Sequence, residues 1–174
     1  ALRQGYKRQM QETGVVISVT TDRDFESSLA DVRAAPRDHG RLELIVRRPA
    51  EDEREILGEA VLDTTVGLVG DSWFERGSSR TPDGSANPES QVTVISTRVL
   101  RAIEPDVLRW PLAGDQLYVD FDLGQEGLPP GSRIAVGSAV LVVSEQPHTG
   151  CAKFSARFGS DALRWINSAV GREL

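Results

Sequence analysis

The sequence predicts a mostly β, barrel-like domain with helices at its periphery. Segments with the alternation or the apolar, β-branched content of strands recur along most of the chain, as over 41–47, 117–121 and 139–143. Helical patterns are too few for a regular alternation of strands and helices, so a doubly wound sheet is the less favoured alternative. The chain has 174 residues, which is enough for one domain with a substantial core and too few for two comfortable ones.

A polar and basic stretch begins the chain, and a helix follows it. We expect residues 1–20 to form an N-terminal tail or an edge strand, and residues 21–174 to form the single domain. Apolar residues that share one helical face predict a helix, which Pro36 and Gly40 end. The first residues of this helix resemble a capping box. The residues on which the helix prediction depends are Thr21, Asp24, Phe25, Leu29 and Val32.

From residue 41 the pattern changes to alternation of apolar and polar side chains. Leu42, Leu44 and Val46 point to one side, which predicts a strand over 41–47. A weaker strand is expected over 56–62. The two together indicate a hairpin or an adjacent ladder with a charged loop between its strands.

Residues 64–91 are the most irregular part of the chain. Glycine, serine, proline, asparagine and aspartate dominate this stretch. A loop of this length inside a compact domain is usually functional or disordered. Trp73 and Phe74 need something to pack on, which weighs against full disorder, so we interpret this stretch as a lid or a binding loop.

Strands and short helices share the second half of the chain. The predicted strands cover 92–95, 117–121, 133–136 and 139–143. The predicted helices begin after Ser96 and cover 154–158 and 161–166. Gly137 separates the last two strands and indicates a bulge or a sharp corner. The continuous apolar run of the last strand is typical of a buried strand.

The composition of the chain argues against several classes of function. The net charge of −6 argues against a general nucleic-acid binder, because phosphate contacts need a basic face. No apolar run reaches the roughly 18 residues of a membrane span, and the N-terminus lacks the apolar core of a signal peptide. One cysteine cannot form an internal disulfide. We therefore expect a cytoplasmic protein with no nucleic-acid or membrane partner, whose oligomeric state the sequence leaves open.

The only cysteine, Cys151, is the first candidate for chemistry. It follows the last predicted strand in a polar turn that contains Gly150, and a helix is predicted just after it. A cysteine acts as a nucleophile or metal ligand only as the thiolate, which nearby cations and helix N-termini favour. His148 and Lys153 lie close to it in sequence, so we predict Cys151, His148 and Lys153 as catalytic residues. The alternative is that Cys151 is unreactive and only fills a gap in the core.

Other kinds of site have weaker support in the sequence. No second cysteine is available for zinc, and His39 and His148 are far apart, which argues against closed metal coordination. A Cys-His hydrolase would need one of these histidines as its base and a further group to orient it. Arg76 and Arg80 are either solvated loop charges or a clamp for an anionic ligand, since arginine binds phosphate with two parallel hydrogen bonds.

Several motifs together resemble the MOSC domain, which occurs at the C-terminus of molybdenum-cofactor sulfurases and in stand-alone bacterial proteins. They are GLVGD over 67–71, QVTVIS over 91–96 and GSAVLVVSEQPHTGCAKF over 137–154. The resemblance covers residues 41–174. Its most specific part is the Q-P-x-x-x-C-x-K arrangement, formed by Gln146, Pro147, Cys151 and Lys153.

This resemblance implies a MOSC-like β-barrel with Cys151 near its mouth. It also implies that Cys151 carries sulfur as a persulfide, or ligates the molybdenum of a molybdopterin cofactor, as in relatives that reduce N-hydroxylated compounds. The expected partners are the pterin cofactor and a redox or sulfur-donor protein. A soft thiolate suits molybdenum and sulfane sulfur. Asp71, Arg80 and Asn87 of the long loop are the candidates to close over the cofactor.

Two other functions compete with this one. The first is a non-catalytic binding or assembly module that has kept the barrel and lost the cofactor site. The second is a metal-free thiol transferase, which requires a thiol that ionises well below the ~8.5 of free cysteine.

Overall fold

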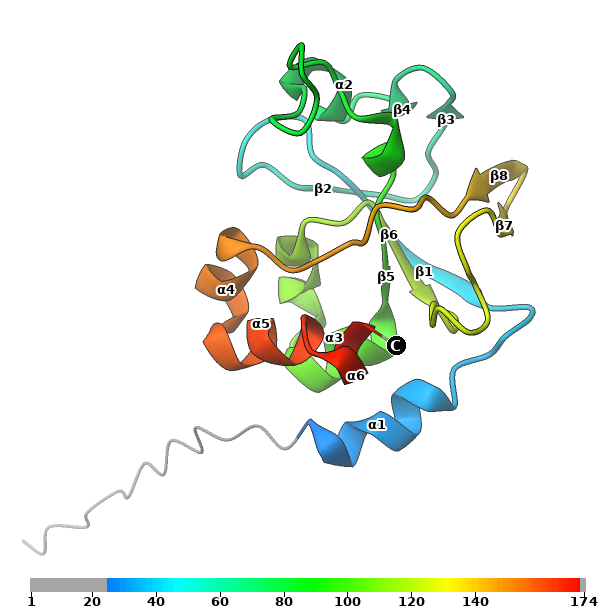
Figure 1. Ribbon diagram of the computed structural model, residues 1–174, viewed down its shortest axis with the longest axis vertical. Helices are drawn as coiled ribbons and strands as arrows, with labels where there is room; N and C mark the ends of the chain where they lie inside the picture. The colour runs from blue at the N-terminus through cyan, green and yellow to red at the C-terminus, as the bar shows by residue number, and fades with distance from the viewer. Residues whose placement is uncertain (1–24, 173–174) are drawn as a thin grey trace, which may run out of the picture.

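A computed structural model describes residues 25–172 (Figure 1). The tail or edge strand expected over 1–20 and the capping residues Thr21 and Asp24 lie outside this range. Helices and strands follow one another in the order α1 (Glu26–Arg33), β1 (Arg41–Arg47), β2 (Glu55–Leu57), β3 (Leu62–Asp63), β4 (Gly67–Leu68), α2 (Trp73–Arg76), η1 (Pro88–Ser90), β5 (Val94–Ser96), α3 (Thr97–Ile103), η2 (Val107–Ala113), β6 (Leu117–Asp120), β7 (Arg133–Val136), β8 (Ala139–Val142), α4 (Ala152–Phe158), α5 (Ser160–Ile166) and α6 (Ala169–Arg172).

The expected mostly β barrel is wrong. The structure is mixed α/β, 31% helical and 20% strand, and its small sheets do not close into a barrel within the described residues. The central sheet has the order β2-β1-β6-β5, in which β1 runs antiparallel to β2 and β6, and β5 runs parallel to β6. Strands β3 and β4 form a separate ribbon, and β7 and β8 form another. The short strands thus pair in three local groups, while much of the apolar core is built by helices.

The first core lies between helices α1, α3, α4 and α5; in Figure 1 α1, α3 and α5 lie below the sheet and α4 lies to its left. Phe25, Leu29 and Val32 of the α1 segment are all buried in it, which confirms the predicted helical face. The ring of Phe25 stacks on that of Trp165, with 4.8 Å between the ring centroids. Helix α1 is therefore packed against the C-terminal helices.

The second core covers the central sheet. It consists of Val46, Ile95, Leu100, Trp110 and Tyr118, from three strands, α3 and η2. The hydroxyl of Tyr118 donates to the carbonyl oxygen of Trp110 at 3.1 Å. The sequence did not predict η2, whose Trp110 and Pro111 are buried while Val107 and Leu108 are exposed.

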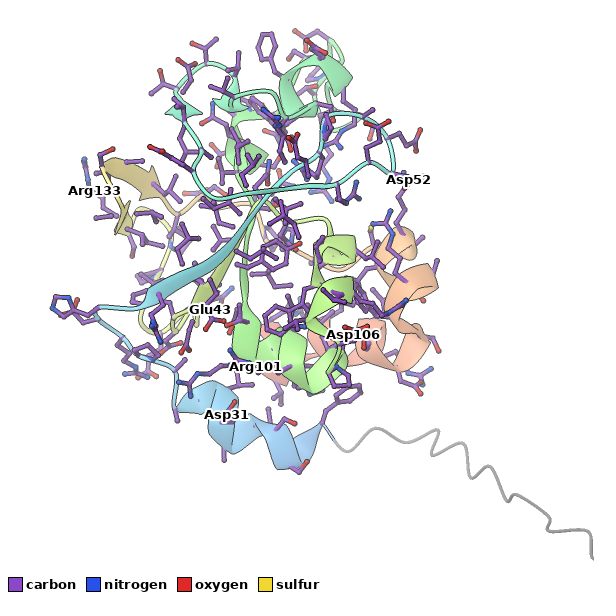
Figure 2. All side chains as sticks on the ribbon, turned by 180° about the vertical axis from the view of Figure 1, so that it is seen from behind. Asp31, Glu43, Asp52, Arg101, Asp106 and Arg133 are labelled. Atoms are coloured by element: carbon purple, nitrogen blue, oxygen red, sulfur yellow. The ribbon has the colours of Figure 1, made fainter. Side chains whose placement is uncertain are left out.

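Ion pairs at the surface connect α1, α3 and β1. Figure 2 shows Glu43 of β1 and Arg101 of α3 facing each other, with 3.0 Å between Oε2 and Nη2. Arg98 of α3 pairs with Asp31 of α1 at 3.2 Å and with Asp120 of β6 at 2.6 Å. Among residues 25–172, no helix combines the length and apolar character of a membrane span.

Two predicted strands differ from those observed. The stretch 56–62 divides between β2 and β3, with a turn between them. The strand predicted over 139–143 is confirmed as β8, but its predicted burial is wrong, because β8 forms a two-stranded hairpin with β7 that leaves Val140 52% and Val142 61% exposed. Gly137, at φ +60°, lies in the tight turn of this hairpin rather than at a bulge.

The long loop, 64–91, is irregular for most of its length, as predicted. It contains only the short elements β4, α2 and η1. Trp73 is buried, while Phe74 is about half exposed. The loop is tied to the residue after β1, because the Ser72 N–H donates to the Arg48 carbonyl oxygen at 2.9 Å.

Candidate functional site

Cys151 is exposed and immediately precedes helix α4. Its backbone is extended, and Phe154 and Phe158 of α4 are buried in the first core. The two phenylalanines lie on the inner face of the helix and hold it against the domain. The thiol therefore lies at the surface on a fixed support, and the alternative of a cysteine that fills the core is excluded.

The turn before Cys151 is docked onto helix α5. A side chain on Gly150 would place its Cβ 2.8 Å from Cδ1 of Leu163 and 3.1 Å from Cγ2 of Ile166. The Asn167 side chain brackets the same residue, because its Oδ1 accepts from the Gly150 N–H (2.9 Å) and its Nδ2 donates to the Gly150 carbonyl oxygen (3.1 Å). Gly150 is thus required by close packing.

His148 forms an ion pair with a buried carboxylate. Its Nε2 lies 3.0 Å from Oδ1 of Asp115, whose side chain is only 3% exposed, whereas that of His148 is 55% exposed. This oxygen is buried and has no hydrogen bond of good geometry with any described residue. The charge of His148 is therefore the main compensation for the charge of Asp115.

The charges of this pair stabilise each other. Asp115 raises the pKa of His148 above its ordinary value of 6.5, and a negative charge on Cys151 acts in the same direction, against the effects of burial and of Arg48. Burial alone would raise the pKa of Asp115, but His148, a hydrogen bond from the Thr93 side chain and Arg48 together outweigh it and hold that pKa below its ordinary value. The structure thus brings His148 and Cys151 into one electrostatic group with Asp115.

Lys153 has a different environment from the one expected. Its Nζ lies 2.5 Å from Oε1 of Glu51, in the segment after β1. Arg157, one turn further along α4, pairs with Asp52 of the same segment at 2.7 Å, and Figure 2 shows Asp52 beside the C-terminal helices. The charge of Lys153 is therefore compensated, and its ion pair joins α4 to this segment.

Asp71 is a structural residue in this fold. Its side chain is fully buried and accepts from Nε (2.9 Å), Nη2 (2.8 Å) and the backbone N–H (2.9 Å) of Arg48. It also accepts from the backbone N–H of Trp73 at 3.0 Å. These contacts engage both carboxylate oxygens and join the loop to Arg48, while the expected role of Asp71 in closing over a cofactor stays a prediction.

The Arg48–Asp71 pair supports the segment that carries Asp115. Nη1 of Arg48 donates to the carbonyl oxygen of Gly114 at 2.7 Å. The fully buried Gln116 accepts through Oε1 from the backbone N–H (2.8 Å) and the hydroxyl (2.7 Å) of Thr93. Asp115 is thus held between two residues whose polar contacts are fixed, and its position is well defined.

Asn87 connects the long loop to the segment that enters the site. Its Nδ2 donates to Oε1 of Gln146 at 2.7 Å, and its Oδ1 accepts from the backbone N–H of Glu89 at 3.1 Å, which caps η1. Both ends of this side chain are engaged. Asn87 therefore positions the loop, which is a different role from the direct cofactor contact that we expected.

Arg80 lies at an open, polar cleft of about 400 Å³ in the long loop. Within the described part of the chain, neither Arg80 nor Arg76 forms an ion pair. This cleft retains uncompensated positive charge suited to an anion. Its lining residues are Arg76, Gly77, Ser78, Ser79, Arg80 and Ser90.

Sequence reasoning missed two residues of the site, Asp115 and Asn167. Asp115 lies just before β6, and a charged side chain at the entry of an apolar strand is the signal that could have pointed to it. Asn167, just after α5, had no distinguishing signal. Within residues 25–172, no three His, Cys, Asp or Glu side chains gather as a ready set of metal ligands.

Comparisons of the chain with protein-family models, with curated proteins and with solved structures find no match. The resemblance to the MOSC domain stays a prediction from the motifs of the sequence.

Proposed function

We propose that this protein works through Cys151, which carries sulfur as a persulfide or ligates the molybdenum of a pterin-bound cofactor, as its resemblance to the MOSC domain implies. The observation that supports this most is an exposed thiol three residues after a histidine whose positive charge is stabilised by a buried carboxylate. Such a cation favours the thiolate, which is the form that binds metals and sulfane sulfur.

The residues at the site fit the cofactor in part. Cys151 offers one soft ligand, which suits molybdenum, and it is accessible from solvent. The cleft with Arg76 and Arg80 offers positive charge for an anionic group of the cofactor. Both carboxylate oxygens of Asp71 already accept hydrogen bonds, and Asn87 already uses its Oδ1 and one of the two N–H groups of its Nδ2. When bound, the cofactor would supply redox chemistry such as the reduction of N-hydroxylated compounds.

The protein's own residues have clear tasks in this proposal. Asn167 and the packing of Gly150 on α5 orient the turn that presents the sulfur. His148 keeps a positive charge in the same turn, three residues before the thiol. The sulfur can thus take up a soft electrophile without rearrangement of the backbone.

The test is to express the protein in a host that makes molybdenum cofactor. Molybdenum is measured by elemental analysis, pterin by fluorescence, and sulfur on Cys151 by intact-protein mass. We expect at least one of the three, lost in the matched variant Cys151→Ser. The alternative is a binding module, although one without the barrel. It would carry neither metal, pterin nor extra sulfur, and the substitution Cys151→Ser would change none of its partner interactions.

A further inference from the structure

We propose that the cleft bordered by Arg76 and Arg80 binds a small phosphorylated compound, and that the two arginines hold its phosphate group. The ligand is defined by its chemistry, which is one phosphate monoester on a polar body without an aromatic ring, as in a sugar phosphate. This inference goes beyond the proposed function, because the cleft needs neither the thiol of Cys151 nor a cofactor bound to it.

The uncompensated charge of the two arginines is the first argument. Among residues 25–172, neither the Arg76 nor the Arg80 side chain forms an ion pair or a hydrogen bond. No aspartate or glutamate of the described chain borders the cleft, although the loop contains several. One of them, Asp83, accepts instead from the Ser85 N–H at 3.0 Å. Two cations therefore border one open space without a carboxylate to neutralise them.

The donors of the cleft suit a phosphate group. A guanidinium donates two parallel hydrogen bonds to phosphate, and a phosphate monoester carries about 1.5–2 negative charges near neutral pH, so one such group can engage both arginines. The Ser79 hydroxyl forms no hydrogen bond within the described part of the chain and is free to donate to a phosphate oxygen. The Ser90 hydroxyl donates to the Asn87 carbonyl oxygen at 3.2 Å, which leaves its oxygen able to accept from a hydroxyl of the ligand.

Hydrogen bonds fix the backbone of the cleft before any ligand binds. The Ser78 N–H donates to the Gly84 carbonyl oxygen at 3.2 Å, and the Arg80 N–H donates to Oγ of Ser78 at 3.1 Å. Gly77 has φ +66°, and a Cβ at this position would collide with the Gly84 carbonyl oxygen, so the close approach of the two strands of the loop requires glycine. A site whose backbone is already ordered loses less conformational entropy when the ligand binds.

The size and lining of the cleft indicate what the rest of the ligand is. Its volume of about 400 Å³ lies within the range of small-molecule sites, which is roughly 300–1,000 Å³. Only arginine, glycine and serine line it, so it offers no aromatic ring to stack on a base and no apolar side chain to bury a lipid tail. The net charge of −6 also opposes a long polyanion. A small phosphorylated sugar or polyol therefore fits this cleft better than a nucleotide, a phospholipid or a nucleic acid.

Binding of three probes to the full chain, followed by NMR, tests the proposal. The probes are ribose 5-phosphate, inorganic phosphate and ribose. We expect ribose 5-phosphate to bind, inorganic phosphate to bind more weakly, and ribose not to bind. In the wild-type protein, ribose 5-phosphate should shift the backbone N–H signals of Ser78, Ser79 and Arg80. If these signals do not move, or if ribose binds as well as its phosphate, the proposal is wrong, and this measurement needs no variant.

Arg76→Gln and Arg80→Gln identify the groups that hold the phosphate. Each should weaken the binding of ribose 5-phosphate by about tenfold or more, because each removes a charge-assisted, bidentate donor. Arg133→Gln is the matched control, since it removes the same charge from an exposed arginine of β7, which Figure 2 labels on the β7–β8 hairpin. The control should change the affinity by less than about twofold. An equal loss in all three variants would show that only net charge attracts the ligand, which would overturn the site.

Two further measurements separate this inference from its rivals. AMP should bind no more than about threefold tighter than ribose 5-phosphate, because the lining holds no ring on which its base could stack. A preference for AMP of tenfold or more would overturn the assigned class of ligand. Cys151→Ser should keep the full affinity for ribose 5-phosphate, whether or not the wild-type protein carries molybdenum, pterin or sulfur. If this variant loses the binding, the cleft belongs to the cysteine site and is not a site of its own.

Discussion

Asp71 illustrates how one residue can satisfy a motif and still serve a different purpose. It belongs to the GLVGD motif, and yet its carboxylate is fully buried and bound by the side chain and backbone of Arg48. A paired buried charge of this kind contributes little net stability over an apolar pair, but the loss of one partner leaves the other charge uncompensated. The contribution of Asp71 is therefore best measured through the free energy of unfolding.

We predict that Asp71→Ala lowers the free energy of unfolding by about 3–5 kcal/mol, because it strands the buried guanidinium of Arg48. Urea denaturation gives this value. The control is Glu55→Ala, which removes a carboxylate from a partly exposed pair with Arg47 and should lower it by no more than about 1 kcal/mol. If the two substitutions lower the free energy of unfolding equally, the burial of Asp71 does not contribute to the effect.

At the scale of elements, the thiol site depends on how helices α4 and α5 meet the turn before Cys151. Gly150 packs against Leu163 and Ile166, and Asn167 forms two hydrogen bonds with its peptide groups. Helix α4 is held from its other side by the ion pairs of Lys153 and Arg157. The site is thus fixed by helix packing.

We predict that Gly150→Ala destabilises the protein by about 1–3 kcal/mol, because the new methyl group overlaps with Leu163. In a Leu163→Ala background, which removes the overlapping Cδ1 atom, the same substitution should have a clearly smaller effect. Thermal or urea unfolding of the four proteins measures this coupling. If the two effects simply add, steric overlap is not the reason for glycine at this position.

At the scale of the whole molecule, buried charge pairs make stability depend on pH in two directions. The pKa values of Asp71 and Asp115 are held below the ordinary 3.8, so their stabilising contribution is complete above that value and is lost as the pH falls through the lowered pKa values. The pKa of His148 is raised above 6.5, so its contribution is complete below 6.5 and is lost as the pH rises through the raised pKa.

We therefore predict that these groups make the protein most stable between about pH 4 and 6.5, with a decline on the alkaline side that comes from His148. Urea unfolding at a series of pH values shows the curve. In His148→Gln the alkaline decline should flatten, while the loss of stability in acid should remain because of Asp71. If the alkaline decline in stability is unchanged in this variant, a titratable group other than His148 causes it.

Local patterns in the sequence predicted local structure well. The helical face of Phe25, Leu29 and Val32 and the position of strand β1 depend on neighbours along the chain, and both were correct. The barrel was wrong because strand-like composition does not say which strands pair. The apolar residues Val140 and Val142, for instance, belong to an isolated hairpin.

The candidate site was predictable only in part, for the same reason. Cys151 and His148 are neighbours in sequence and in space, and both stand out in a polar turn. Lys153 is even closer to Cys151 in sequence, but the turn of helix α4 directs its side chain to Glu51. Asp115 is brought to His148 by the tertiary fold, and no local pattern of the sequence indicates this contact.

The position of Cys151 also has a practical consequence for the purified protein. It is the chain's only cysteine and its sulfur is open to solvent, so any disulfide that air oxidation produces must join two copies of the chain or attach a small thiol from the buffer. A band of twice the monomer mass on a non-reducing gel, abolished by dithiothreitol, would thus report a disulfide between two copies of the chain through Cys151.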